Sequence, residues 1–269
     1  SDPSDESGEV TDCFDSETVL RSREIRNSND EDPKNQEITL TTSVALTASE
    51  AAREKRRARQ TIESEDEFYI AYYLLDKKIA LTDKRPSKAD TNIFLCIPAA
   101  FTQLDDGSID GLFIIDGKIT DRKKVNHHLG GGLLVVNNQL HIFKTVEGKL
   151  LTENWKDSIS SLKGSFFQQI QMVRDGEALE FRKDQKLFQR RAVVIYHDGV
   201  IAVVESKSPI TLQEFANDLV KMKVRDALYT DMGSYDEGWA RNPANRAIEV
   251  VGQNRTQTAF QSNWLVFRK

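Results

Sequence analysis

The sequence predicts an α+β fold, built from a mixed, largely antiparallel sheet with a few packed helices. Three observations support this prediction. Short apolar runs recur from residue 92 onward, separated by Gly, Asp and Asn turns. Pairs typical of β-hairpin turns occur at 116–117, 137–138, 175–176 and 198–199. One segment, 211–222, instead has the apolar spacing of an amphipathic helix.

The chain divides into three expected regions. Residues 1–36 are polar and acidic, which predicts a flexible N-terminal arm. Residues 37–91 are expected to form an extension packed on the main domain. It contains a Thr-rich strand at 38–45, a helix that begins with Thr47 and Glu50 as a capping box and ends near Ser64, and a strand or buried helical turn at 68–75. Residues 92–269 are expected to form the main domain.

Within the main domain the apolar runs predict nine strands, at 93–97, 111–115, 133–136, 140–143, 167–173, 192–196, 200–205, 227–230 and 263–267. A helix is predicted to follow Thr211, whose side chain caps it with Glu214 three residues later. The apolar residues on one side of that helix are Leu212, Phe215, Ala216, Leu219, Val220 and Met222. A shorter helix is predicted over 154–162.

Composition narrows the classes of function. The net charge is −5 and 39% of the residues are hydrophobic, which indicates a protein with a sizeable core and no broad basic surface. Nucleic acid is therefore not an expected partner, and the basic run 53–59 is interpreted as a solvated helix face. The sequence has no apolar stretch of about 18 residues, so no transmembrane segment is predicted.

Cysteine usage and the N-terminus bear on cofactors and location. Cys13 and Cys96 form no CxxC or Cys/His cluster, so neither a metal site nor another cofactor is expected. Cys96 is interpreted as a small buried hydrophobe, and a disulfide between the two cysteines stays open. The acidic start without Met favours a mature exported protein, periplasmic or at the cell surface, with a possible N-terminal lipid anchor in the precursor. An arbitrary chain boundary is the other interpretation.

Several segments occur in an order known from one family. They are 97–102, 111–118, the Val173-containing turn 172–176, 190–194, the Thr-Leu-Gln-Glu-Phe-Ala segment 211–216 and the Ala-Leu-Tyr-Thr-Asp-Met-Gly-Ser segment 227–234. Together they resemble the phosphodiester glycosidase family, the domain of the lysosomal uncovering enzyme, as a divergent bacterial exported member. The resemblance covers roughly residues 92–267. Segment 97–102 lacks the family's Asn-Gly-Gly, and the Asp-Gly-rich signature is shortened at 231–234.

The chemistry of the expected site depends on two carboxylates and two arginines. Asp231 directly follows an apolar strand, which is a natural position for an acid or base, and Asp236 is a candidate second carboxylate. The alternatives are a turn-forming Asp and a solvated loop. The resemblance implies that Arg191 and Arg255 clamp a phosphate. The alternative for each arginine is a structural salt bridge.

Other residues are expected to contact the substrate. Gly233 and Ser234 belong to a turn that lets a ligand approach backbone N–H groups. His128 is a candidate to assist a leaving phosphate, with a surface position as the alternative. Trp239 offers an aromatic face to a sugar, or packs beneath the loop. Gln169 is placed at the same rim by the resemblance alone.

Two functions stay open after the sequence. The first is an exported hydrolase that cleaves a glycosyl phosphodiester, a sugar-1-phosphate ester. The second is a catalytically weakened module on the same fold that binds a glycan or a cell-envelope polymer. Both take a carbohydrate or sugar-phosphate ligand, and fold by itself does not choose between them.

Overall fold

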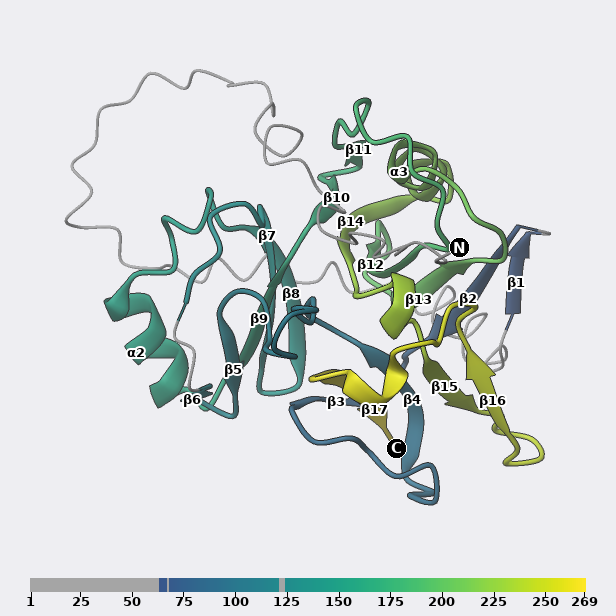
Figure 1. Cartoon of the computed structure of the whole chain (residues 1–269), viewed down its shortest axis with the longest axis horizontal. Coiled ribbons are helices and arrows are strands. Elements are labelled where there is room, and N and C mark those ends of the chain that lie inside the picture. Colours follow the sequence, from purple (N-terminus) through teal and green to yellow (C-terminus); the bar gives the residue numbers. More distant parts are fainter. Residues whose placement is uncertain (1–62, 67, 121–123) are drawn as a thin grey trace, which may run out of the picture.

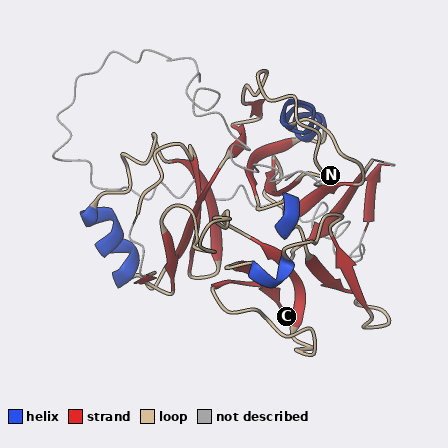
Figure 2. Cartoon of the chain, viewed as in Figure 1, coloured by secondary structure: helices blue, strands red, loops and turns tan. Residues whose placement is uncertain are grey.

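The computed structural model describes residues 63–66, 68–120 and 124–269 (Figure 1). The expected arm at 1–36, the strand at 38–45 and nearly all of the helix after Thr47 lie outside the described residues. The end of that helix was expected near Ser64, but Glu63–Asp66 form a strand, β1. Antiparallel sheets dominate the described part (Figure 2). It contains only two α-helices, so the expected α+β fold with a few packed helices is confirmed only in part.

The largest sheet has seven strands in the order β1-β2-β13-β12-β14-β10-β11. Its strands after β1 are β2 (Tyr69–Tyr73), β10 (Gln171–Arg174), β11 (Glu177–Ala178), β12 (Arg191–Tyr196), β13 (Ile201–Ser206) and β14 (Val224–Tyr229). The hairpin of β12 and β13 turns at Gly199, whose φ of 80° is in the left-handed region that favours glycine. This sheet lies beside α3 in Figure 1.

Two five-stranded sheets complete the fold, in the orders β16-β15-β4-β17-β3 and β6-β5-β9-β7-β8. The first contains β3 (Lys78–Thr82), β4 (Ile93–Pro98), β15 (Gly238–Arg241), β16 (Ile248–Val251) and β17 (Trp264–Arg268). The second contains β5 (Phe113–Ile115), β6 (Lys118–Ile119), β7 (Gly131–Val136), β8 (Gln139–Lys144) and β9 (Ser165–Gln169). Gly131 and Gly132 are the first two residues of β7.

A central core fills the space where the three sheets meet. Val193 and Val203 of the large sheet, Leu265 of the second and Phe167 of the third belong to the same buried cluster. The alternate residues of the large sheet, such as Val194, face a different cluster that includes α3. Because both faces of β12 are covered, its apolar run is continuous instead of alternating.

Both helices that the sequence predicts in the main domain are present. Helix α3 (Leu212–Lys221) begins at Thr211, whose side chain forms the predicted capping box with Glu214. Four of its six predicted apolar positions are buried, while Val220 and Met222 are partly buried at the edge of the cluster. Helix α2 (Glu153–Ser161) packs on the third sheet through Trp155 and Ile159.

One predicted strand divides between two sheets. The run 167–173 was expected to be a single strand, but β9 pairs with β5 and β7, whereas β10 pairs with β14 in the large sheet. The chain crosses from one sheet to the other at Ile170, whose backbone N–H donates a hydrogen bond to the side-chain oxygen of Gln169 at 2.9 Å. Apolar content is high on both sides of the crossing, so the pattern shows no break.

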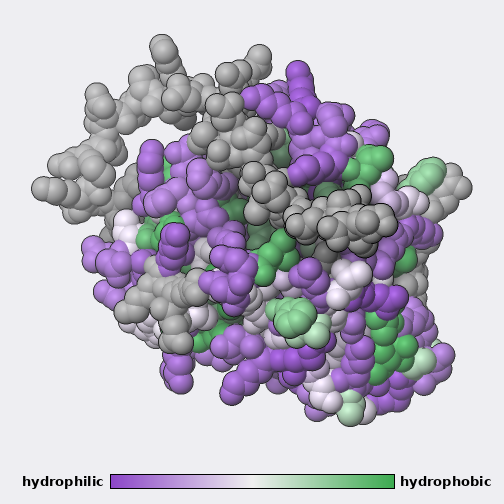
Figure 3. Space-filling model, in the orientation of Figure 1, coloured by the Kyte–Doolittle hydropathy of each residue, from purple (hydrophilic) through white to green (hydrophobic). Residues whose placement is uncertain are grey.

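Strands from before residue 92 are part of these sheets. Strand β2 pairs along its whole length with β13, and β3 pairs with β17. The boundary expected at residues 91 and 92 stays a prediction. On the face shown in Figure 3, hydrophilic residues cover most of the described surface, and hydrophobic residues form separate small groups.

Candidate active site

A buried ion pair lies where β12 begins and β13 ends. Arg191 and Glu205 are directly opposed in the antiparallel register of these strands. The Arg191 guanidinium approaches Glu205 Oε2 at 2.7 Å from Nε and 2.6 Å from Nη2. Arg191 is completely buried and Glu205 is 3% exposed. Two buried opposite charges in this geometry hold each other in place, because either alone would be costly to desolvate.

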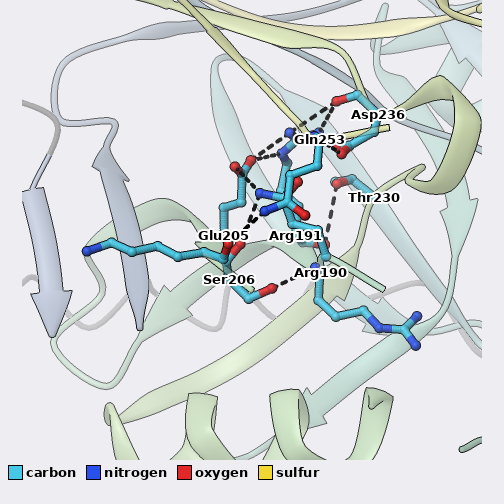
Figure 4. A network of polar contacts seen from close by, with 9 residues as sticks. Arg190, Arg191, Glu205, Ser206, Thr230, Asp236 and Gln253 are labelled. Carbon is cyan, nitrogen blue, oxygen red and sulfur yellow. Dashed lines mark hydrogen bonds and ion pairs between the residues drawn. The ribbon is translucent and has the colours of Figure 1, made fainter. Parts of the chain in front are cut away.

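Asp236 completes the cluster from a distant part of the chain (Figure 4). Its Oδ1 lies 3.3 Å from Arg191 Nη2, and its carbonyl accepts hydrogen bonds from both terminal nitrogens of that guanidinium. Its Oδ2 accepts a hydrogen bond from the backbone N–H of Gln253 at 2.6 Å. One arginine therefore faces two buried carboxyl groups.

The environment shifts the ionisation of this cluster. Burial raises the pKa of Asp236 to about 6, helped by the charge of Glu205 and opposed by Arg191. Burial alone would lower the pKa of Arg191, but the Glu205 and Asp236 carboxylates outweigh it and the pKa is raised. The arginine consequently stays charged at every pH at which the protein would be studied.

A third carboxyl group, Asp231, follows β14 by two residues. Its backbone N–H donates to the carbonyl of Ala99 at 2.9 Å, and its Oδ2 accepts from the Thr102 N–H at 3.1 Å. These bonds tie the ends of β14 and β4 together. Asp231 is only 3% exposed, and burial raises its pKa well above the ordinary value, with the charge of Asp236 adding to the effect. A raised pKa favours the protonated form of this carboxyl group, and that form is the one that can donate a proton.

The residues after Asp231 form a short turn. Gly233 has φ of 77° and begins the short 3-10 helix η1 (Gly233–Tyr235). A side chain built on Gly233 would meet open space. Gln169 reaches the same place from β9, because its side-chain amide donates to the Ala99 carbonyl at 3.4 Å. Asp231 and Gln169 therefore share one backbone acceptor at the junction of two sheets.

The structure brings together Asp231, Asp236, Arg191 and Gln169, but it buries them. The Arg191 guanidinium points to Glu205 and Asp236 instead of to a rim. Its neighbour Arg190 extends the other way, where its guanidinium donates to the carbonyls of Ile210 and Lys186 (Figure 4).

The remaining expected residues lie elsewhere. Arg255 is exposed on the chain between β16 and η2 (Thr258–Phe260). His128 is exposed in the loop before β7, where its backbone N–H donates to the side chain of Asn126. Ser234 lies within η1. Trp239 is in β15 and belongs to a buried cluster with Trp264.

Sequence reasoning missed Glu205, although a signal was present. Counting outward along both strands from the turn at Gly199 pairs Ile195 with Ile201 and, four residues further on each strand, Arg191 with Glu205. A charged residue at the end of each apolar strand, at matching distance from the turn, predicts a cross-strand ion pair. Thr102 carried no such signal, since its bond to Asp231 uses only the backbone N–H.

Two hollows are found on the described part of the molecule, with volumes of about 300 and 250 Å³. The larger is lined by residues of the loop after β3 and by Glu237, Trp239 and Trp264. The smaller lies on the loop 103–111 beside Lys124. Neither of these two hollows is lined by Arg191, Asp231 or Arg255.

The described residues contain no group of three or more His, Cys, Asp or Glu side chains placed to hold a metal ion. In the same residues no helix is long and apolar enough to cross a membrane.

Comparison with known proteins shows similarity in fold without similarity in sequence. No family model and no curated protein matches the chain. Among solved structures, the chain is similar to the zebrafish N-acetylglucosamine-1-phosphodiester alpha-N-acetylglucosaminidase catalytic domain auto-inhibited by its pro-peptide. The two share a TM-score of 0.50 and 11% identity over 78% of this chain and 86% of that one. A hypothetical protein from Synechocystis matches with a TM-score of 0.46 and 10% identity over 78% of this chain and 61% of its own. A distant fold relationship to a phosphodiester glycosidase catalytic domain is thus supported.

Proposed function

We propose that this protein is a hydrolase that cleaves a glycosyl phosphodiester, with Asp231 as the acid and Asp236 as the second carboxyl group. The observation that carries the proposal is the pair itself. Both carboxyl groups have raised pKa values, that of Asp231 well above the ordinary range and that of Asp236 about 6. Two carboxyl groups whose environments separate their pKa values are a common source of acid and base in one site.

The proposed reaction adds water across the bond between the sugar C1 and the phosphate oxygen. In this reaction Asp231 carries a proton and donates it to the departing phosphate oxygen. Asp236 is largely ionised and accepts the proton of the attacking water as the C1–O bond breaks. The products are a free sugar and a phosphate monoester, and the proton moves on to reset Asp231. Arg191 holds Asp236 in place through its guanidinium and opposes its protonation.

Two features support the assignment to this site over another. Asp231 is anchored by backbone bonds at the junction of β14 and β4, which keeps its carboxyl position constant. A side chain built on Gly233, two residues further along the chain, would meet open space. The fold similarity to a phosphodiester glycosidase catalytic domain agrees with the same chemistry, although it carries no residue assignment.

The test uses hydrolysis of hexosyl 1-phosphomethyl diesters in ¹⁸O-labelled water. Cleavage of the C1–O bond places the label in the sugar, whereas attack at phosphorus places it in methyl phosphate. We expect the label in the sugar and a loss of about 10²–10⁴-fold in turnover for Asp231→Asn. Asp157→Asn, which changes an exposed carboxylate on α2, is the matched control and should keep full turnover. Label in methyl phosphate, or unchanged turnover of a folded Asp231→Asn variant, would overturn the proposal.

A binding module on the same fold is the second candidate. It is favoured by the complete burial of Arg191 between two carboxyl groups and by the absence of Asp231 from both hollows found in the described residues. Saturable binding of the diesters with no release of sugar would support this candidate and contradict the hydrolase.

Export to the periplasm or cell surface is part of the proposal. The expected result is degradation by added protease in intact cells or in cells whose outer membrane alone has been permeabilised, and protection until the inner membrane is broken would contradict it.

A further inference from the structure

The larger hollow lies on the outer side of the five-stranded sheet that contains β15 and β17. Trp239 alternates along β15 with Ala240, which faces the central core, and Trp264 precedes Leu265, which also faces that core. The hollow is therefore on the face of the sheet opposite to the central core. Its volume of about 300 Å³ is at the lower end of the range of about 300–1,000 Å³ for ligand sites.

Two tryptophans are among the residues that line this hollow. Trp239 and Trp264 are only 4% and 5% exposed and pack in one cluster with Cys96 and Val266. Buried rings with fixed neighbours cannot rotate freely, so a ligand that contacts them loses little side-chain entropy from the protein. Guanidinium groups lie over both rings, Arg85 over Trp264 and Arg241 over Trp239, so the small exposed part of each indole offers an apolar contact for sugar C–H groups.

Charged side chains form the wall. Lys88 and Glu237 make an ion pair at 2.7 Å, with 44% and 17% of their side chains exposed. The Arg85 guanidinium lies 5.3 Å above the ring of Trp264 and donates to the carbonyl of Thr258. Among the described residues, no carboxylate lies within ion-pair distance of Arg85. Of the charges that line the hollow, the positive charge of Arg85 therefore has no ion-pair partner among the described residues.

We propose that this hollow binds an acidic sugar residue, with its anionic group on Arg85 and its ring against the two indoles. A guanidinium recognises a carboxylate or phosphate through paired N–H donors. Lys88 and Glu237 supply a donor and an acceptor for the sugar hydroxyls. A sugar joins an apolar face to a polar edge, and this hollow offers a surface for each. The volume accommodates a single residue of a saccharide.

The hollow is separate from the carboxyl groups of the proposed hydrolase. Glu237 lines the hollow, while the preceding residue, Asp236, contacts Arg191 in the buried cluster. Binding in the hollow therefore does not depend on the proposed reaction, and the Asp231→Asn variant should bind like the parent protein.

Tryptophan fluorescence provides the measurement, because the chain has three tryptophans and two of them line the hollow. The third, Trp155, packs on Phe166 beneath α2. Trp155→Phe would leave only the two reporters in the hollow, and the wild-type protein serves if that variant folds poorly. The probes are trigalacturonate, its fully methyl-esterified form, which is neutral, and glucose 6-phosphate, which separates carboxylate from phosphate recognition.

We expect saturable binding of trigalacturonate or glucose 6-phosphate, and at least about tenfold weaker binding of the neutral ester. Arg85→Gln should weaken binding of the anionic probe about tenfold, while Arg85→Lys keeps part of it. Arg182→Gln, at a largely exposed arginine, is the matched control and should change nothing. The proposal would be overturned if neither trigalacturonate nor glucose 6-phosphate saturated the protein up to about 10 mM. Equal binding of the acid and its ester, or equal effects of Arg85→Gln and Arg182→Gln, would also overturn it.

Discussion

Replacing Arg191 by glutamine should destabilise the fold strongly. The change removes a completely buried cation and leaves Glu205 and Asp236, 3% and 2% exposed, facing each other without it. Removing one partner of a buried ion pair typically costs about 3–5 kcal/mol. That is a large part of a total stability of about 5–15 kcal/mol. With a urea m-value of about 2–3 kcal/mol/M for a domain of this size, the midpoint should fall by about 1–2.5 M.

The assay is urea unfolding followed by circular dichroism at pH 7.5 and at pH 5. Burial already raises the pKa of Asp236 to about 6, and loss of Arg191, which opposes protonation, should raise it further. At pH 5 the carboxyl is mostly protonated, so the destabilisation should be smaller there than at pH 7.5. Arg182→Gln, at an exposed arginine, should stay within about 0.5 kcal/mol of the parent protein. If both variants unfolded at the same urea concentration, Arg191 would not stabilise the buried cluster as argued.

Three further perturbations follow from particular contacts. Because the pKa of Asp236 in the folded protein, about 6, exceeds its ordinary value, this group stabilises the fold below about pH 4 and loses that contribution as pH rises through 6. The urea midpoint of Asp236→Asn should not show this decline with rising pH. If the midpoints of the variant and the parent protein changed in parallel with pH, this assignment would be contradicted. Gly252→Ala should lower the free energy of unfolding several times more than Gly107→Ala. Both glycines have positive φ, but only at Gly252 would the new Cβ lie 2.8 Å from Asp236 Cγ and closer still to the Asp236 carbonyl oxygen. Equal midpoints for the two variants would show that this contact relaxes freely. Thr211→Ala should lower stability by about 0.5–2 kcal/mol through loss of the α3 cap, with Ser158→Ala on α2 as the control; a smaller loss than in the control would argue against the capping box.

Much of the local structure is determined by the sequence itself. The helix after Thr211 has its cap, its third-position glutamate and its apolar side within ten residues, so its ends follow from contacts that the sequence states directly. The hairpins at 116–117, 137–138 and 175–176 likewise follow from residues that adopt positive φ. The register around Gly199 even contains the Arg191–Glu205 pair, because strands joined by a tight turn oppose each other in order.

Tertiary structure decided what the site is. Periodicity shows that a residue lies on a buried side, but not which distant segment covers it. Asp236 follows Arg191 by 45 residues, and it reaches the guanidinium only because the chain turns at η1 and enters β15 of another sheet. The switch of sheets at Ile170 and the outward face of Trp239 arise in the same way, from long-range pairing that leaves no trace in a local pattern. Whether an arginine meets a ligand or a carboxylate depends on which charge arrives beside it, since a buried guanidinium without a partner is too costly to persist.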